Sequence, residues 1–77
     1  MKISLYGMLA EAAATTQLEI NDFRGKSIMD LRKVVEEKYP QLKNMTYKIA
    51  VNKKIAKENE TLNKTDEVAF LPPFAGG

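Results

Sequence analysis

The sequence predicts a small α+β domain, in which a mixed β-sheet packs one face onto a single main helix. Two short stretches near the start alternate apolar with polar residues, a middle stretch repeats apolar residues at helical spacing, and the second half returns to alternation. The chain has 77 residues, 44% of them hydrophobic. That is enough for one core, close to the lower limit for a domain without crosslinks.

Two strands are expected before the helix. Ile3 and Leu5 alternate with polar neighbours in the first, and Leu18 and Ile20 do the same in the second. Such an alternation places one set of side chains on each face of a sheet, so one face of each strand should be buried. Between the strands, residues 7–14 are expected to form a loop that contains a helical turn.

The main helix is expected to begin after Ser27 and to end near Tyr39. Ser27 can cap the first turn, and Asp30 can answer it in a short-armed capping box. Pro40 marks the end, because the residue before a proline is disfavoured in the helical conformation. The apolar residues that recur on one helical face are Ile28, Leu31, Val34 and Val35.

The second half of the chain predicts further strands. A third strand is expected at residues 47–51, followed by a turn at 52–54 and a short segment around Ile55. A polar turn at 63–66 then leads into a last strand at 67–71.

This order of elements matches the β-grasp, or ubiquitin-like, roll. In that topology the first and last strands lie side by side at the centre of the sheet. The alternation then places Leu5, Val68 and Phe70 on the helix side. We expect residues 1–71 to form the β-grasp domain and residues 72–77 to form an extended C-terminal tail.

The same alternation predicts an apolar patch on the open face of the sheet. Tyr6 and Leu71 should face away from the helix, and Ile55 and Phe74 should join them beside the tail. Exposed apolar residues that gather in this way are typical of a partner site. The alternative is that they are singly exposed residues of no consequence, as most protein surfaces carry.

Composition excludes several functions. The chain has no cysteine and no histidine, which rules out disulfides, thiolate metal ligands and a serine–histidine or cysteine–histidine mechanism. A formal charge of +2 is too small and too evenly spread to indicate nucleic acid, and we interpret Lys53, Lys54 and Lys57 as a solvated turn. The start resembles no signal peptide and no stretch has membrane-spanning length, so we expect a soluble cytoplasmic protein.

The tail is the best candidate for the working part. Pro72-Pro73 restricts its base and lowers the entropy lost on entering a partner, while Gly76-Gly77 leaves the carboxylate unobstructed. From Pro73 to Gly77, at about 3.3 Å a residue, the tip reaches about 16 Å. The alternative is a fraying tail or a cloning remnant.

The residues before the glycines carry a specific resemblance. Residues 51–62, and residues 66–77 with the sequence DEVAFLPPFAGG, closely resemble the C-terminal half of molybdopterin synthase small subunits, the MoaD branch of the MoaD/ThiS sulfur carriers. Residues 5–11 resemble the family's first strand and loop more loosely. The Pro-Pro-x-x-Gly-Gly ending after Asp-Glu-Val is a strong motif. Phe74 is bulkier than the valine that is common there.

The resemblance implies a sulfur-carrier cycle. An E1-like adenylyltransferase activates the Gly77 carboxylate with ATP, and sulfur from a donor protein replaces the adenylate to give a thiocarboxylate. The tail then enters the large subunit of molybdopterin synthase and supplies sulfur to cyclic pyranopterin monophosphate, which builds the dithiolene. The resemblance also implies a heterotetramer, no cofactor bound by this chain and no catalysis by it alone. The residues expected to contact the partner are Tyr6, Ile55, Leu71, Pro72, Pro73, Phe74 and Ala75, with Gly76 keeping access to the carboxylate open.

Three other functions remain open at this point. A thiamine-thiazole sulfur carrier shares the fold and the Gly-Gly ending, although Pro72-Pro73 argues against it. A ubiquitin-like modifier would join target lysines through Gly77 after the same adenylation. A non-reacting β-grasp interaction module would have an inert tail, so that deletion of Gly77 would change nothing.

Overall fold

A computed structural model describes residues 1–21, 23–24 and 26–73. The predicted strands and main helix all form, and residues 8–13 form a six-residue helix where a helical turn was expected. In chain order the elements are β1 (Lys2–Leu5), α1 (Met8–Ala13), β2 (Gln17–Glu19), α2 (Ile28–Lys38), the 3-10 helix η1 (Pro40–Leu42), β3 (Lys48–Val51), β4 (Lys54–Ile55) and β5 (Val68–Leu71).

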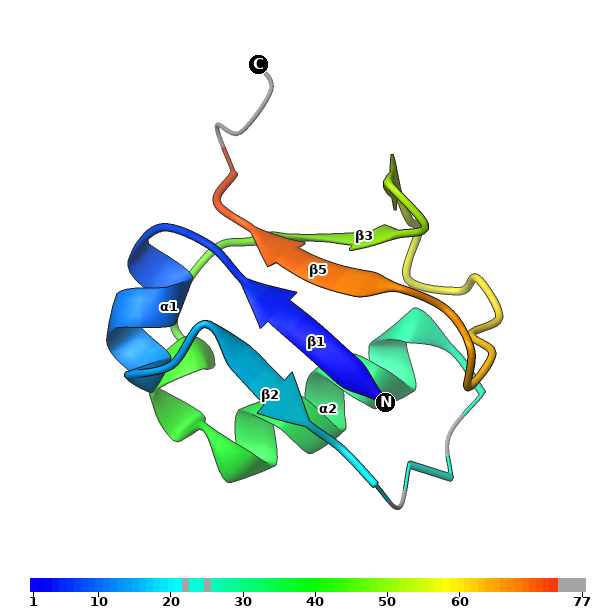
Figure 1. Ribbon diagram of the computed structural model, residues 1–77, viewed down its shortest axis with the longest axis horizontal. Helices are drawn as coiled ribbons and strands as arrows, with labels where there is room; N and C mark the ends of the chain where they lie inside the picture. The colour runs from blue at the N-terminus through cyan, green and yellow to red at the C-terminus, as the bar shows by residue number, and fades with distance from the viewer. Residues whose placement is uncertain (22, 25, 74–77) are drawn as a thin grey trace.

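The strands form one mixed sheet in the order β2-β1-β5-β3-β4. Figure 1 shows β5, in orange, between β1 and β3. β1 and β5 are parallel, with Leu5 opposite Phe70, while the other neighbouring pairs are antiparallel. The prediction that the first and last strands are neighbours inside the sheet is therefore confirmed.

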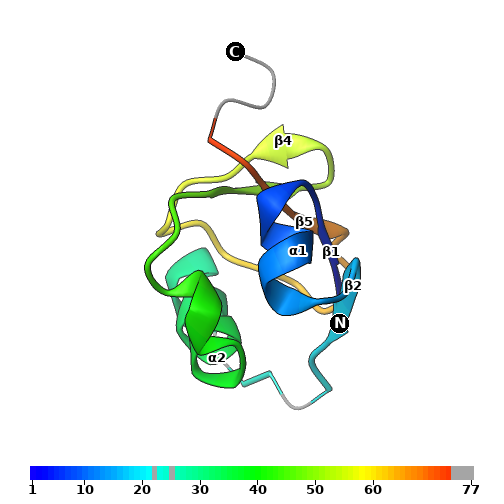
Figure 2. The ribbon, with the colours of Figure 1, turned by 90° about the vertical axis from the view of Figure 1, so that its left-hand side faces the viewer.

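Helix α2 crosses one face of this sheet and leaves the other face open (Figures 1 and 2). It begins with the predicted capping box. The backbone N–H of Asp30 donates to the Ser27 hydroxyl at 3.2 Å, and the Ser27 N–H donates back to the Asp30 carboxylate at 3.1 Å. The helix ends at Lys38, and its C-cap Tyr39 directly precedes Pro40. Both ends are therefore set by the residues that the sequence singled out.

The core lies between α2 and the sheet. Leu5, Val68 and Phe70 are all buried there, as their alternation predicted. The ring of Phe70 stacks on Tyr47, with centroids 4.9 Å apart and planes 14° from parallel. The remaining members of this cluster include residues of both helices and of η1, namely Leu9, Ala13, Ile28, Leu31, Val35 and Leu42. One face of the sheet is thus fully used for folding, and only the other is free for a partner.

Candidate functional site

The open face of the sheet carries an apolar pocket of about 280 Å³ beside the end of β5. Of the predicted patch residues, Tyr6, Ile55 and Leu71 all line it. Tyr6 is 51% exposed and Ile55 is 55% exposed, whereas Leu71 is half-buried. The structure therefore brings together three residues that lie far apart in the sequence. Phe74, the fourth predicted member, lies outside the described residues.

Two alanines form the floor of this open-face pocket. Ala50 on β3 is the register partner of Ala69 on β5, and both line the pocket. Their short side chains leave a depression between the larger side chains of Tyr6, Ile55 and Leu71. A depression with apolar walls is suited to receive an apolar side chain from another protein.

Two opposite charges lie at the same pocket. Lys53 comes from the turn between β3 and β4, and Glu67 directly precedes β5. The sequence around Lys53 indicated a solvated turn, and Glu67, Ala50 and Ala69 were not among the predicted site residues. Strand alternation could have identified Glu67 and Ala69, because positions 67, 69 and 71 share one face of an extended strand. A partner that fills the pocket can match both charges around an apolar centre.

The tail leaves the sheet at Pro72, which lies against the turn between β1 and α1. Gly7 in this turn has φ 58° and ψ −133°. A Cβ atom placed on Gly7 would lie 2.9 Å from Cγ of Pro72. Pro72 and Pro73 are half-buried, whereas the predicted site residues Ala75, Gly76 and Gly77 lie outside the described residues. The role of the tail therefore stays a prediction, and Gly7 is a residue that sequence analysis missed.

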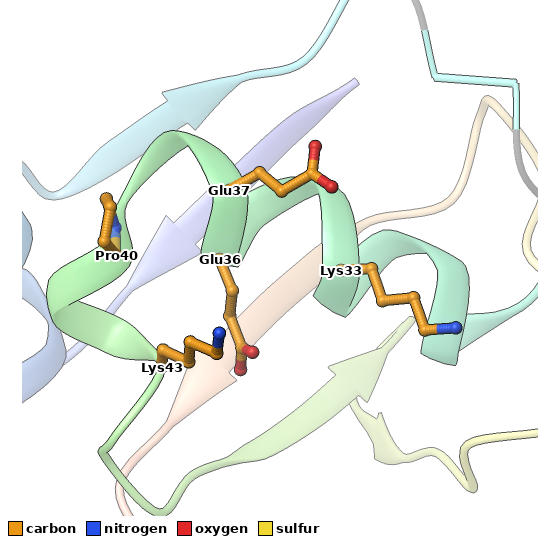
Figure 3. Close-up of a pocket in the computed structure, with 5 residues that line it drawn as sticks. All are labelled: Lys33, Glu36, Glu37, Pro40 and Lys43. Carbon is orange, nitrogen blue, oxygen red and sulfur yellow. The ribbon is translucent and has the colours of Figure 1, made fainter.

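A second pocket, of about 400 Å³, lies on α2 and the segment that follows it (Figure 3). Its lining consists of Lys33, Glu36, Glu37, Pro40 and Lys43. Figure 3 shows the carboxylates of Glu36 and Glu37 pointing in different directions. Glu36 already accepts a hydrogen bond from the Tyr47 hydroxyl at 2.6 Å, and burial together with this bond raises the pKa of Tyr47. A rim of long charged side chains makes this pocket a weaker candidate than the open-face pocket.

The described ranges, 1–21, 23–24 and 26–73, contain no group of three or more acidic side chains placed to hold a metal ion. Across the same ranges, no helix has the length and apolar character needed to cross a membrane.

Comparison with known proteins identifies the family. The ThiS family model matches residues 3–77. The molybdopterin synthase sulfur carrier subunit of Mycobacterium tuberculosis strain H37Rv is 32% identical over 80 aligned positions, which cover all of this chain and 96% of the relative. Both matches extend over the strands, the helix and the tail. They confirm the resemblance that the C-terminal motif indicated.

Solved structures confirm the β-grasp fold. The solution structure of small archaeal modifier protein 1 from Methanosarcina acetivorans matches with a TM-score of 0.81 and 26% identity, covering 99% of this chain and 94% of that one. The protein–protein complex of subunits 1 and 2 of the molybdopterin-converting factor from Helicobacter pylori contains a chain that matches with a TM-score of 0.68 and 24% identity, covering 99% and 96%. With its C-terminal motif, its β-grasp sheet and a match from residue 3 to residue 77, the chain belongs to the ThiS family of MoaD/ThiS sulfur carriers.

Proposed function

We propose that this chain is the sulfur-carrying small subunit of a molybdopterin synthase and that Gly77 carries the sulfur as a C-terminal thiocarboxylate. One observation carries the proposal. The match to the M. tuberculosis sulfur carrier subunit spans the entire chain, including the Pro72-Pro73 and Gly76-Gly77 pairs. The proposal requires Gly77 to be the last residue of the working protein. The molecule acts as one subunit of an enzyme and has no activity alone.

The chemistry begins with activation of a poor electrophile. An oxygen of the Gly77 carboxylate attacks the α-phosphorus of ATP on an E1-like adenylyltransferase, and pyrophosphate leaves. Sulfide supplied by a donor protein then attacks the acyl carbon, AMP leaves with the electron pair of the broken C–O bond, and the thiocarboxylate remains; where the donor presents a persulfide, a second thiol must reduce the resulting S–S bond to release the thiocarboxylate. The absence of a side chain at Gly76 and Gly77 leaves the acyl carbon open to this attack. ATP is therefore a substrate of the activating enzyme, and this chain binds no cofactor.

The open-face pocket supplies the docking surface in this proposal. Tyr6, Ile55 and Leu71 are exposed or half-exposed at one pocket, and Pro72 follows Leu71 directly, so a partner that covers this pocket also receives the tail. The partner is the synthase large subunit, which contributes the pterin site. Support comes from the H. pylori structure, a complex of subunits 1 and 2 in which one chain has this fold. Two small and two large subunits form the proposed heterotetramer, and the cytoplasm is its proposed location.

Intact-mass measurement tests the sulfur chemistry directly. Incubation with the cognate adenylyltransferase, ATP and a sulfur donor should raise the mass by about 16 Da, the exchange of one oxygen for sulfur. A variant that lacks Gly77 should show no gain. An unchanged mass with an adenylyltransferase that modifies its own known carrier would overturn the proposal.

A ubiquitin-like modifier is the second candidate, and the 26% identity to small archaeal modifier protein 1 is the observation that favours it. Adenylation is common to both routes, so the products must be compared. A modifier forms amide bonds between Gly77 and lysines of other proteins, whereas a sulfur carrier returns to its unmodified mass after transfer. Peptide mapping for a lysine that carries the C-terminal peptide of this chain separates the two; trypsin, which cuts after Lys64, would leave residues 65–77 on that lysine. Capture of a thiazole synthase in place of the synthase large subunit would instead indicate the thiamine-thiazole branch.

A further inference from the structure

Gly7 and Pro72 lie just beyond the parallel pairing of β1 and β5. Leu5 is the register partner of Phe70, and the N–H of Tyr6 donates to the Phe70 carbonyl at 3.3 Å. Two residues further along each strand, the same register brings Gly7 opposite Pro72. Here the two segments of the chain separate, because the chain turns into α1 at Gly7, whereas the tail begins at Pro72.

The contact between them is possible only because Gly7 has no side chain. A Cβ atom at this position would lie 2.9 Å from Cγ of Pro72 and 3.9 Å from its Cδ. Non-bonded carbon atoms are attractive at about 3.5–4.0 Å, so the shorter of these two distances is repulsive. The positive φ of 58° at Gly7 also disfavours any other residue. Glycine thus permits both the turn and the seating of the Pro72 ring.

We infer that Gly7 is a positioning residue, which sets the direction in which the sulfur-carrying tail leaves the sheet by letting Pro72 rest against the β1–α1 turn. The inference rests on the proposed function. Pro72 and Pro73 both have a fixed φ, so backbone rotation absorbs less of a displacement of the first ring and more of it is passed to the following residues. A group that reacts in a partner's site loses rate steeply when it is misplaced by about 1 Å.

A double-mutant cycle between Gly7→Ala and Pro72→Ala tests the contact. All four full-length proteins are converted to the thiocarboxylate, and the rate of sulfur transfer is measured with saturating synthase large subunit. We expect Gly7→Ala to lower this rate about tenfold when Pro72 is present. In the Pro72→Ala background, where the Cγ atom is gone, we expect the same change to lower it less than about threefold.

The cycle separates positioning from stability. Strain at φ 58° is present in both backgrounds, so a purely structural role would give equal losses, or lower stability with unchanged transfer. Denaturant unfolding of each variant identifies a temperature at which all four are folded, and the rates are measured there. Equal fold-changes in the two backgrounds, or no change at all, would overturn the inference.

A spectroscopic readout keeps this test independent of sulfur transfer. Gly7→Ala should move the amide resonances of residues 74–77 in the presence of Pro72 and leave them in place in the Pro72→Ala background. If those resonances do not move, Gly7 does not direct the tail, whatever the chain carries. If the wild-type chain gains no sulfur, the proposed function fails. If the wild-type chain gains and transfers sulfur, and the Gly7→Ala variant transfers it at the same rate, only the positioning role of Gly7 fails.

Discussion

Asn52 is joined to Asp66 by a side-chain hydrogen bond of 3.1 Å, from Nδ2 of the amide to Oδ1 of the carboxylate. The amide oxygen of Asn52 accepts a second bond from the N–H of Glu67 at 3.0 Å. Asn52 has φ 52° and Lys53 has φ 71°, so both central residues of the β3–β4 turn are left-handed. The Asn52 side chain therefore fastens this turn, with Lys53 and Ile55 of the open-face pocket, to the start of β5.

Replacement of Asn52 by glycine should lower the free energy of unfolding by about 1 kcal/mol, because the positive φ is kept and the side-chain bonds are lost. Asn52→Ala should lower the free energy of unfolding by about 2 kcal/mol in total, because alanine loses the same bonds and is also strained in the left-handed backbone conformation. Urea unfolding measures both. Lys53→Gly is the control in the same turn and should be neutral or slightly stabilising. If Asn52→Gly were as stable as Lys53→Gly, the side-chain bonds would contribute nothing.

Ala14 offers a stabilising substitution. It ends α1 in the left-handed conformation, with φ 58° and ψ 31°, and is exposed. Ala14→Gly should raise the free energy of unfolding by about 0.5 kcal/mol, since glycine adopts this conformation without strain. Ala12→Gly, inside the same helix, should lower it by about 1 kcal/mol. Denaturation midpoints of the two variants on opposite sides of the wild type would confirm this; a loss from Ala14→Gly would contradict it.

The capping box should make stability depend on acid pH. Backbone N–H groups of Lys26 and Ser27 donate to Asp30 and hold the pKa of its carboxyl below its ordinary value of 3.8. A carboxyl whose pKa is lowered by folding stabilises the fold above its unfolded pKa, and this contribution disappears as the pH falls through the folded pKa. We expect wild-type stability to decline below about pH 4, and Asp30→Asn to flatten that decline.

Thermal unfolding between pH 2 and pH 7 measures the effect of Asp30. Glu37→Gln, at an exposed position of the same helix, serves as the matched control. It should keep the acid decline of the wild type. Identical pH profiles for Asp30→Asn and the wild type would show that the capping carboxylate does not contribute.

A charge placed in the open-face pocket should weaken the partner complex. Ile55→Asp should raise the dissociation constant for the synthase large subunit at least about tenfold, because burial of an unpaired carboxylate opposes an apolar contact. The control is Met29→Asp, since Met29 is also exposed, at 42%, but belongs to α2 on the other side of the sheet. Calorimetric titration of both variants decides the matter. If Ile55→Asp bound the large subunit as tightly as Met29→Asp does, the open-face pocket would be excluded as the docking surface.

Much of the fold could be predicted because its signals are local. The capping box of Ser27 and Asp30, the stop at Pro40 and the alternation around Leu5 and Phe70 each act within a few residues. Three strand boundaries differ slightly, and the third strand begins at Lys48, one residue later than expected. The second strand ends at Glu19, before Ile20, although Ile20 still exchanges backbone bonds of 2.8 and 2.9 Å with Met1. The last strand begins at Val68, one residue later than expected, because the Glu67 N–H bonds to the Asn52 side chain.

The candidate site was likewise predictable only where its signals are local. The alternation of single strands placed Tyr6 and Leu71 on the open face, where Ile55 was expected to join them, and the structure brings all three into one pocket. Parity within a strand does not say which residues face one another between strands. The pairing of Ala50 with Ala69, which makes the floor, therefore could not be read from the sequence.

By itself the sequence determined the class of fold, the ends of the main helix and the family, because each depends on residues close together in the chain. Only the tertiary structure decided that Gly7 lies against Pro72 and that Lys53 and Glu67 lie at the apolar pocket. Those contacts depend on the register between strands that are distant in the sequence. That register is set by packing of the whole core, which no local pattern contains.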